Sequence, residues 1–143
     1  ALNIPLLSVN TLLGLCMTAR AQVSDEDALL MPMLDARRME VYNAVYSMEL
    51  TELVATRALI LDEHSFEEYK DKPCYFFGDG MPKFKAIMPP DPNRHYLDTI
   101  LSSATALGLT ALQAFQNKQF EDVAYFEPYY LKEFVSQHIF HKK

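Results

Sequence analysis

Residues 30–46 read LMPMLDARRMEVYNAVY, and this stretch decides the fold. Two apolar runs flank a short charged segment, which is typical of two antiparallel strands joined by a turn. In the second run, alternate side chains from Val41 to Val45 would face one side and those from Tyr42 to Tyr46 the other. Because both sides are largely apolar, the pattern predicts a strand covered on both faces, near the middle of a sheet.

The charged segment between the two strands contains Asp35, Arg37, Arg38 and Glu40. An aspartate and an arginine can form a bidentate pair that fixes a turn. The same residue types could instead form a functional site, a catalytic carboxylate with basic partners. Charged turns are common on protein surfaces. We therefore expect Asp35 and Arg37 mainly to fix the turn, with a functional role as the alternative.

Composition narrows the class of protein. The 143 residues suit one domain, half of them are hydrophobic and 22% are charged, which is ordinary for a soluble globular protein. The formal net charge is -6 and no block of Lys or Arg is long, so direct nucleic-acid binding is disfavoured. Cys16 and Cys74 lie in apolar surroundings, which predicts reduced core thiols of a cytoplasmic protein. The apolar stretch 4–17 is too short to span a bilayer.

Elements outside the hairpin follow from the same kind of pattern. We expect a short buried strand over 4–7, then a helix from about residue 9 to 19 capped by Ser8. A third strand begins near Leu53, its second part irregular, and a short helix over 65–70 has Ser65 as its cap.

The second half alternates in the same way. Residues 73–77 predict a strand of a parallel sheet that ends in a glycine turn, and 88–93 are a loop. Apolar spacing from Leu97 to Phe115 predicts the longest helix, with a strip of small residues suited to close packing. Strands and helices intermixed in this way predict an α/β fold with a mixed sheet and flanking helices.

Three further groups could carry chemistry or bind a partner. The Gly78-Asp79-Gly80 turn could face a phosphate, although a strand-terminal turn needs the same residues. His138 and His141 would share a helical face but have no nearby carboxylate, and isolated histidines such as His64 and His95 are most simply surface residues. We expect the aromatic C-terminal part to pack on the sheet, because aromatic side chains are the largest core contributors, with a surface for a partner as the alternative; its aromatic residues are Tyr125, Phe126, Tyr129, Tyr130 and Phe134.

Four segments, in the same order along the chain, resemble the TsaB (YeaZ) family. Residues 34–42, LDARRMEVY, look like the family's "i-D-A-R-r-x-E-V-Y" hairpin nearly residue for residue. Residues 4–12 are similar to its "P-l-x-x-V-s-s-L" segment, and 77–80 to its "x-G-x-G" turn. Residues 128–132 are similar to its C-terminal "P-x-Y-L-R", with Lys132 in place of the arginine.

This resemblance implies half of an actin-like, ribonuclease H-like ATPase fold. It also implies a non-catalytic partner in the bacterial synthesis of threonylcarbamoyladenosine next to the tRNA anticodon. The partners would be a TsaD-type catalytic subunit and a TsaE-type ATPase, with no direct tRNA binding, no membrane and no cofactor or metal. The alternative is an enzyme of the same broad fold, a nucleotide-dependent enzyme or the M22-type glycoprotease of older descriptions.

The family's N-terminal half begins with an "I-D-T-S/A" strand and carries "G-P-G-S-F-T-G-L-R-I-G", and neither motif occurs here. The resemblance therefore implies a chain cut from something longer, with 1–22 from the end of the N-terminal half and 23–143 as the C-terminal domain. The family's pairing surface lies mainly on the other half. We expect apolar residues between Val9 and Met17 to be exposed as a result, which favours a homodimer or an exchange of elements.

Overall fold

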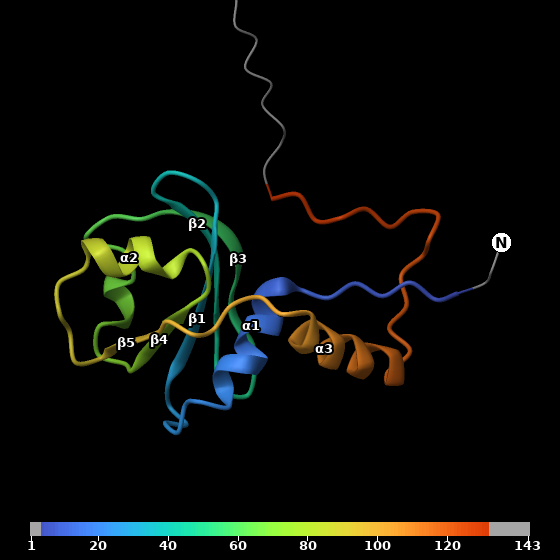
Figure 1. The fold of residues 1–143 in the computed structure, drawn as a ribbon, viewed down its shortest axis with the longest axis horizontal. Helices are drawn as coiled ribbons and strands as arrows, with labels where there is room; N and C mark the ends of the chain where they lie inside the picture. Colours follow the sequence, from blue (N-terminus) through green and yellow to red (C-terminus); the bar gives the residue numbers. More distant parts are fainter. Residues whose placement is uncertain (1–3, 132–143) are drawn as a thin grey trace, which may run out of the picture.

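The predicted hairpin forms the middle of a five-stranded sheet in the computed structural model, which describes residues 4–131. Strands β1 (Leu29–Asp35) and β2 (Glu40–Tyr46) pair antiparallel, and β3 (Glu52–Ile60) extends this meander beyond β2. On the other side of β1, β4 (Cys74–Phe77) and β5 (Arg94–Leu97) add parallel strands. The order β3-β2-β1-β4-β5 confirms the predicted α/β fold with a mixed sheet (Figure 1).

Helices cover both faces of this sheet. Helices α1 (Thr11–Arg20) and α3 (Ala104–Gln116) lie on one side, and α2 (Met81–Ile87) lies on the other (Figure 1). The side chains of β2 alternate between the two faces of the sheet, as predicted: Ala44 and Tyr46 lie in the core beside α1, and Val41 and Val45 lie in the core beside α2. Each fully buried large side chain contributes about 1.5–3 kcal/mol to stability, so both layers hold the sheet in place.

The central strand contains a proline, which removes one ladder donor. The side chain of Asn43 lies fully buried beside it and donates from Nδ2 to the carbonyl oxygens of Pro32 at 3.0 Å and Ala44 at 2.9 Å. Asn43 thus supplies a hydrogen bond where the regular ladder between β1 and β2 is interrupted.

The N-terminal elements differ from the prediction. Residues 4–7 do not form a buried strand: Leu6 makes a single bridge with Glu121, and Ile4 is 69% exposed. Helix α1 is capped by Asn10, whose Oδ1 accepts from the N–H of Leu12 at 2.8 Å, and not by Ser8. The asparagine wins because it lies directly before the first helical residue, where a side-chain oxygen reaches the free N–H groups.

The middle of the chain also corrects two expectations. Strand β3 is continuous to Ile60, so its second part is not irregular. Ser65 caps no helix: its Oγ donates to Asp62 Oδ1 at 2.9 Å, and only a 3₁₀ turn, η1 (Glu67–Tyr69), follows. A serine that closes a local turn with an aspartate competes with helix capping, which explains the shorter helix.

Two elements were not predicted, α2 and β5, and they change the boundaries of the long helix. Leu97 belongs to β5 and Ile100 is buried in the connection, so α3 begins only at Ala104. The small-residue strip does not mediate its packing, because a Cβ at Gly108 would meet nothing within 4 Å. The contact with α1 is made instead by Leu107, which lies against Gly14.

The segment after α3 runs extended and does not pack on the sheet. Tyr125, Tyr129 and Tyr130 are each about four-fifths exposed, so the expectation that these aromatics form core is wrong. Among residues 4–131, no helix or strand covers these three tyrosine side chains, so they remain in solvent. In that same range, no helix combines the length and apolar character needed to cross a membrane.

Candidate functional site

The charged corner between β1 and β2 is held by a lysine from α2. The Lys83 ammonium lies 2.6 Å from Asp35 Oδ1, 2.8 Å from the carbonyl oxygen of Arg38 and 2.7 Å from that of Glu40. Three acceptors match the three N–H bonds of an ammonium. The Lys83 side chain is only 18% exposed, whereas that of Asp35 is 52% exposed, so the lysine is sheltered by the fold while its carboxylate partner faces solvent.

Asp35 links this lysine to the turn backbone. Its Oδ1 also accepts from the backbone N–H of Arg37 at 2.7 Å. The hydrogen bond from Lys83, followed by the one from Arg37, lowers the pKa of Asp35 below its usual value. The expected Asp–Arg side-chain pair is therefore replaced by a lysine pair, although Asp35 does fix the turn.

The corner holds two residues in an unfavourable backbone conformation. Arg37 has φ 70° and Arg38 has φ 49°, and each non-glycine residue in this left-handed region costs about 1–2 kcal/mol. Such strain persists only where the surroundings over-determine the backbone. The contacts of Lys83 and Asp35 provide that restraint, and both arginine side chains extend into solvent.

The glycine turn meets the corner. Asp79 Oδ1 accepts from the backbone N–H of Asp35 at 2.9 Å, so the two motifs singled out separately in the sequence lie side by side. Within the turn, the N–H of Gly78 donates to Ile100 and that of Gly80 to Met33. These two N–H groups are used inside the fold, and Gly78 takes φ 98° beside a β1 carbonyl oxygen that a side chain would strike.

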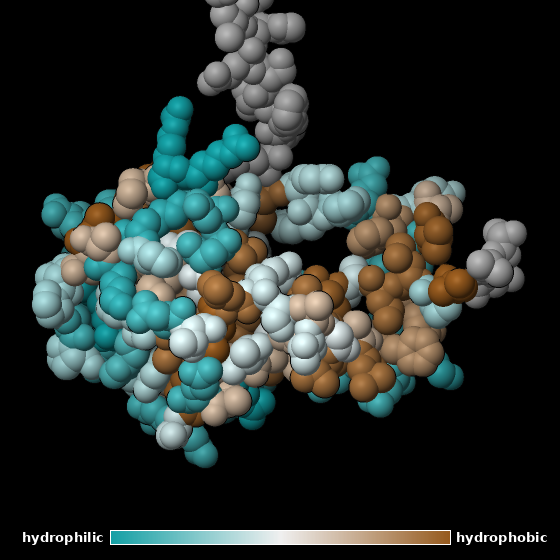
Figure 2. Space-filling view, viewed as in Figure 1, coloured by the Kyte–Doolittle hydropathy of each residue, from teal (hydrophilic) through white to brown (hydrophobic). Residues whose placement is uncertain are grey.

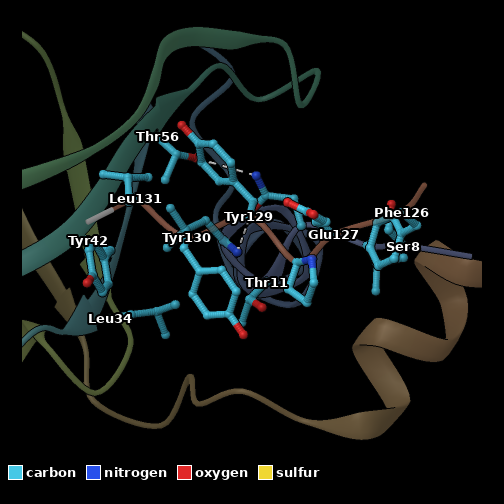
Figure 3. Close-up of a pocket in the computed structure, with 14 residues that line it drawn as sticks. Ser8, Thr11, Leu34, Tyr42, Thr56, Phe126, Glu127, Tyr129, Tyr130 and Leu131 are labelled. Carbon is cyan, nitrogen blue, oxygen red and sulfur yellow. Dashed lines mark hydrogen bonds between the residues drawn. The ribbon is translucent and has the colours of Figure 1, made fainter. Parts of the chain in front are cut away.

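A cavity of about 680 Å³ opens on the face of the hairpin that α1 covers, away from α2 and Lys83, and lies beside the start of α1 (Figure 3). Leu34 and Tyr42, which are cross-strand partners, form its sheet side, and Thr56 of β3 lies at its rim. Tyr129 and Tyr130 of the extended segment lie over the first turn of α1 (Figure 3). The volume falls in the range of small-molecule sites, about 300–1,000 Å³. No local pattern in the sequence indicates this cavity, because its walls come from five separate segments of the chain.

The remaining chemically versatile residues have plain structural roles. Both thiols are buried and free; burial raises the pKa of Cys74 to about 11 and raises that of Cys16 as well. His64 is exposed as expected, whereas His95 lies in β5 and stacks on Tyr75 with ring centroids 4.5 Å apart. Among residues 4–131, no three His, Cys, Asp or Glu side chains lie close enough to hold a metal ion.

Some sequence-level candidates lie elsewhere. His138, His141, Phe134 and Lys132 fall outside the described residues. Lys83, the residue that organises the corner, was not predicted from the sequence. One signal for the helix that carries it was available: Pro82 lies just after the glycine turn, and a proline in the first turn is a common start for a helix.

Comparison with known proteins places the fold. No protein-family model and no curated protein matched the sequence. Two solved structures from Pseudomonas aeruginosa match with 21% sequence identity. One is YeaZ, with a TM-score of 0.64 over 89% of this chain; the other is an uncharacterized protein with similarity to peptidase YeaZ, with a TM-score of 0.66 over 90%.

This chain spans 59% of the length of each of these proteins. The matched region extends over nearly all of the described residues, so the mixed sheet and its helices are shared as a unit. The likeness confirms, at the level of the fold, the expected relation to YeaZ, with a mixed sheet flanked by helices.

Proposed function

We propose that this chain forms part of a non-catalytic, TsaB-type partner subunit that acts in tRNA modification. It would support transfer of a threonylcarbamoyl group to the adenosine next to the anticodon, by pairing with a TsaD-type catalytic subunit assisted by a TsaE-type ATPase. One observation carries the proposal: the LDARRMEVY hairpin, which resembles the family's most specific motif, forms the central strand pair of a YeaZ-like fold.

The geometry of the corner supports a scaffold role. A catalytic carboxylate or ammonium needs a free proton-transfer partner in reach of a substrate. Here Asp35 and Lys83 direct their hydrogen bonds to each other and to the backbone. Groups used in this way make a turn rigid, and a rigid turn presents a fixed surface to a protein partner.

The family resemblance also suggests where the partner binds. We assign residues 1–22 to the end of the family's N-terminal half and 23–143 to the C-terminal domain. The main pairing surface for the catalytic subunit then belongs to the part of YeaZ-like proteins with no counterpart in this chain. In this proposal the corner and the rest of the domain hold the pairing surface in place and do not themselves form its main contacts.

Co-purification with a tagged TsaD-type subunit tests both parts of this proposal. The comparison uses this chain alone and a chain in which a YeaZ N-terminal half precedes the same residues. We expect the longer chain to bind the catalytic subunit at least tenfold more tightly, and to support threonylcarbamoyl transfer to tRNA in the presence of the TsaE-type ATPase.

The possible failures are distinct. If both chains fold but neither binds nor supports transfer, the proposed function is wrong. If this chain alone binds as tightly as the longer one, the function stands and the assignment of the interface is wrong. A control carrying Glu49→Ala, an exposed change in the turn after β2, should behave like the parent chain in every assay.

Peptidase activity is the second candidate, because one structural neighbour is described by its similarity to a peptidase. A cysteine nucleophile requires a thiolate, whereas burial raises the pKa of both thiols here. The described residues therefore support this candidate less well than the partner role. Cleavage of a casein or glycoprotein substrate by the purified chain, lost on a single-residue change, would reverse this order.

A further inference from the structure

The cavity beside the start of α1 is lined by aromatic rings from two different parts of the chain. Tyr42 of β2 belongs to its sheet side, and Tyr129 and Tyr130 come from the extended segment that follows α3 (Figure 3). These two segment tyrosines are about four-fifths exposed, so their ring faces are open to a ligand. Because the face of an aromatic ring carries partial negative charge, such faces attract cations.

The charged groups at the cavity are acidic. Among the described residues that line it, Glu127 carries the only formal charge. Two further carboxylates are bonded to lining residues. Glu52 Oε1 accepts from the backbone N–H of Thr56 at 3.2 Å, and a Glu121 carboxylate oxygen accepts from the hydroxyl of Ser8. With a net charge of -6 for the whole chain, we expect a negative potential at this site.

The helix beside the cavity does not reverse this balance. The free N–H groups at a helix N-terminus carry partial positive charge. In α1 they are covered, because Asn10 Oδ1 accepts from the N–H of Leu12 at 2.8 Å and from that of Leu13 at 3.3 Å. The amide nitrogen of Asn10 is itself directed to Thr56 Oγ1 at 3.4 Å. The cavity therefore favours a cation over an anion.

The start of α1 also corrects an expectation from the sequence. Apolar residues between Val9 and Met17 were expected to be exposed, but Leu12, Leu15 and Cys16 are buried in the core. The exposed residue at this end of the helix is instead the polar cap Asn10, which borders the cavity.

We propose that this cavity binds an arginine side chain from a basic segment of a partner protein. The aliphatic stem of the arginine would pack on Leu34 and Tyr42. Its planar guanidinium would stack on a tyrosine ring of the extended segment and pair with Glu127, contacts for which arginine is better shaped than lysine. The acidic chain would also steer a basic partner toward the site.

The size and shape of the space favour a side chain carried on a backbone. A volume of about 680 Å³ is larger than a lone ammonium ion needs. Figure 2 shows the space as a hollow beneath the extended segment, open to solvent. The backbone on either side of the arginine can therefore remain outside. The site stands whether or not the proposed function is correct, because its charge and geometry do not depend on the family resemblance.

Titration of the purified chain with the blocked peptide Gly-Ser-Arg-Ser-Gly, followed by proton–nitrogen NMR spectra, tests the proposal. We expect saturable shifts at Asn10, Thr56 and Tyr130, with a dissociation constant of about 1–10 mM for a few weak contacts. A peptide with citrulline in place of arginine keeps the shape without the charge, and it should bind about fivefold more weakly or worse. A lysine peptide should also bind more weakly, by about two- to fivefold.

Variants of exposed residues locate the site, and the same spectra report whether each variant is folded. Glu127→Gln removes the charge with little change of shape and should weaken binding of the arginine peptide by about fivefold. Tyr130→Leu removes one ring face and should weaken it by a similar factor of about five. The matched controls are Glu49→Gln and Tyr125→Leu, which change exposed residues outside the described lining and should bind like the parent chain.

Several results would overturn the proposal. One is the absence of saturable shifts at about 50 mM peptide, well above the expected dissociation constant. Another is equal binding of the arginine and citrulline peptides, or a Glu127→Gln chain that binds as tightly as the parent. Ethylguanidinium binding as tightly as the peptide would replace the protein segment by a small organic cation. Tighter binding of indole than of the arginine peptide would identify the occupant as a neutral aromatic group.

Discussion

Replacing Lys83 with methionine would remove the ammonium that holds the β1–β2 corner while keeping most of the aliphatic stem. Lys83 donates to two backbone carbonyl oxygens in addition to Asp35. A hydrogen bond to a charged group contributes about 1.5–3 kcal/mol. The carbonyl oxygen of Glu40 still accepts from the N–H of Ala36, and that of Arg38 lies where water can reach it. We therefore expect a net loss of about 2 kcal/mol.

Lys85 provides the matched control on the same helix. Its ammonium pairs with Asp98 at 3.0 Å, but the two side chains are 46% and 64% exposed. An exposed pair of this kind contributes about 0–1 kcal/mol, so Lys85→Met should change stability little. Lys83→Arg serves as a second comparison, since it keeps the charge but not the compact shape of the ammonium.

Urea unfolding followed by circular dichroism, at one protein concentration for all variants, measures these differences. The thermal midpoint of Lys83→Met should fall by roughly 5–10 °C. If Lys83→Met and Lys85→Met differ in stability by less than about 0.5 kcal/mol, Lys83 does not hold the corner. The strained arginines would then owe their conformation to the turn sequence itself and not to the lysine.

Three further predictions concern single groups. Folding lowers the pKa of Asp35, so the ionised Asp35 carboxylate stabilises the fold at any pH above its usual pKa of 3.8. This stabilisation is lost as the pH falls through the lowered pKa of the folded state. In thermal melts at a series of pH values, the stability difference between wild type and Asp35→Asn should therefore close as the pH falls below 3.8. Gly78→Ala should cost more than about 3 kcal/mol in urea unfolding, because its φ is positive and its Cβ would overlap a β1 carbonyl oxygen, whereas Gly108→Ala should raise the stability of the monomer by about 0.5–1 kcal/mol. Cys16 and Cys74 should resist a thiol reagent at pH 8 in the folded protein and react fully in urea; fast reaction of either thiol before unfolding would contradict their burial.

The hairpin and the parallel strand after it could be predicted because their signals are local. Apolar alternation in 41–46 fixes both faces of β2, and a glycine turn ends β4 where the pattern places it. Strand β5 could not be predicted in the same way. Its four residues are all partly buried, and its aromatic and histidine side chains give no regular period. The helical spacing that includes Leu97 and Ile100 arises by chance, since both residues contribute to the core from outside the helix.

The candidate site was predictable only in part. The acidic and basic residues of the corner were visible in sequence, and so was the glycine turn. Their contact was not, because it joins Asp35 to Asp79 across 44 positions of the chain. Lys83 comes from a third segment, 48 positions from Asp35. Long-range contacts of this kind depend on strand order, and the placement of β4 beside β1 brings all three together.

That strand order also has a consequence during synthesis. Strands β1 to β3 pair in sequence order and are complete at Ile60, but the other edge of β1 waits for β4, which ends at Phe77. At a ribosomal rate of about 5–20 residues per second, translating that gap takes roughly one to three seconds. During this interval the most apolar strand of the nascent chain has one unpaired edge, which is the usual template for aggregation. Slower translation through this region should therefore reduce the soluble yield, and a chaperone that shields strand edges should restore it.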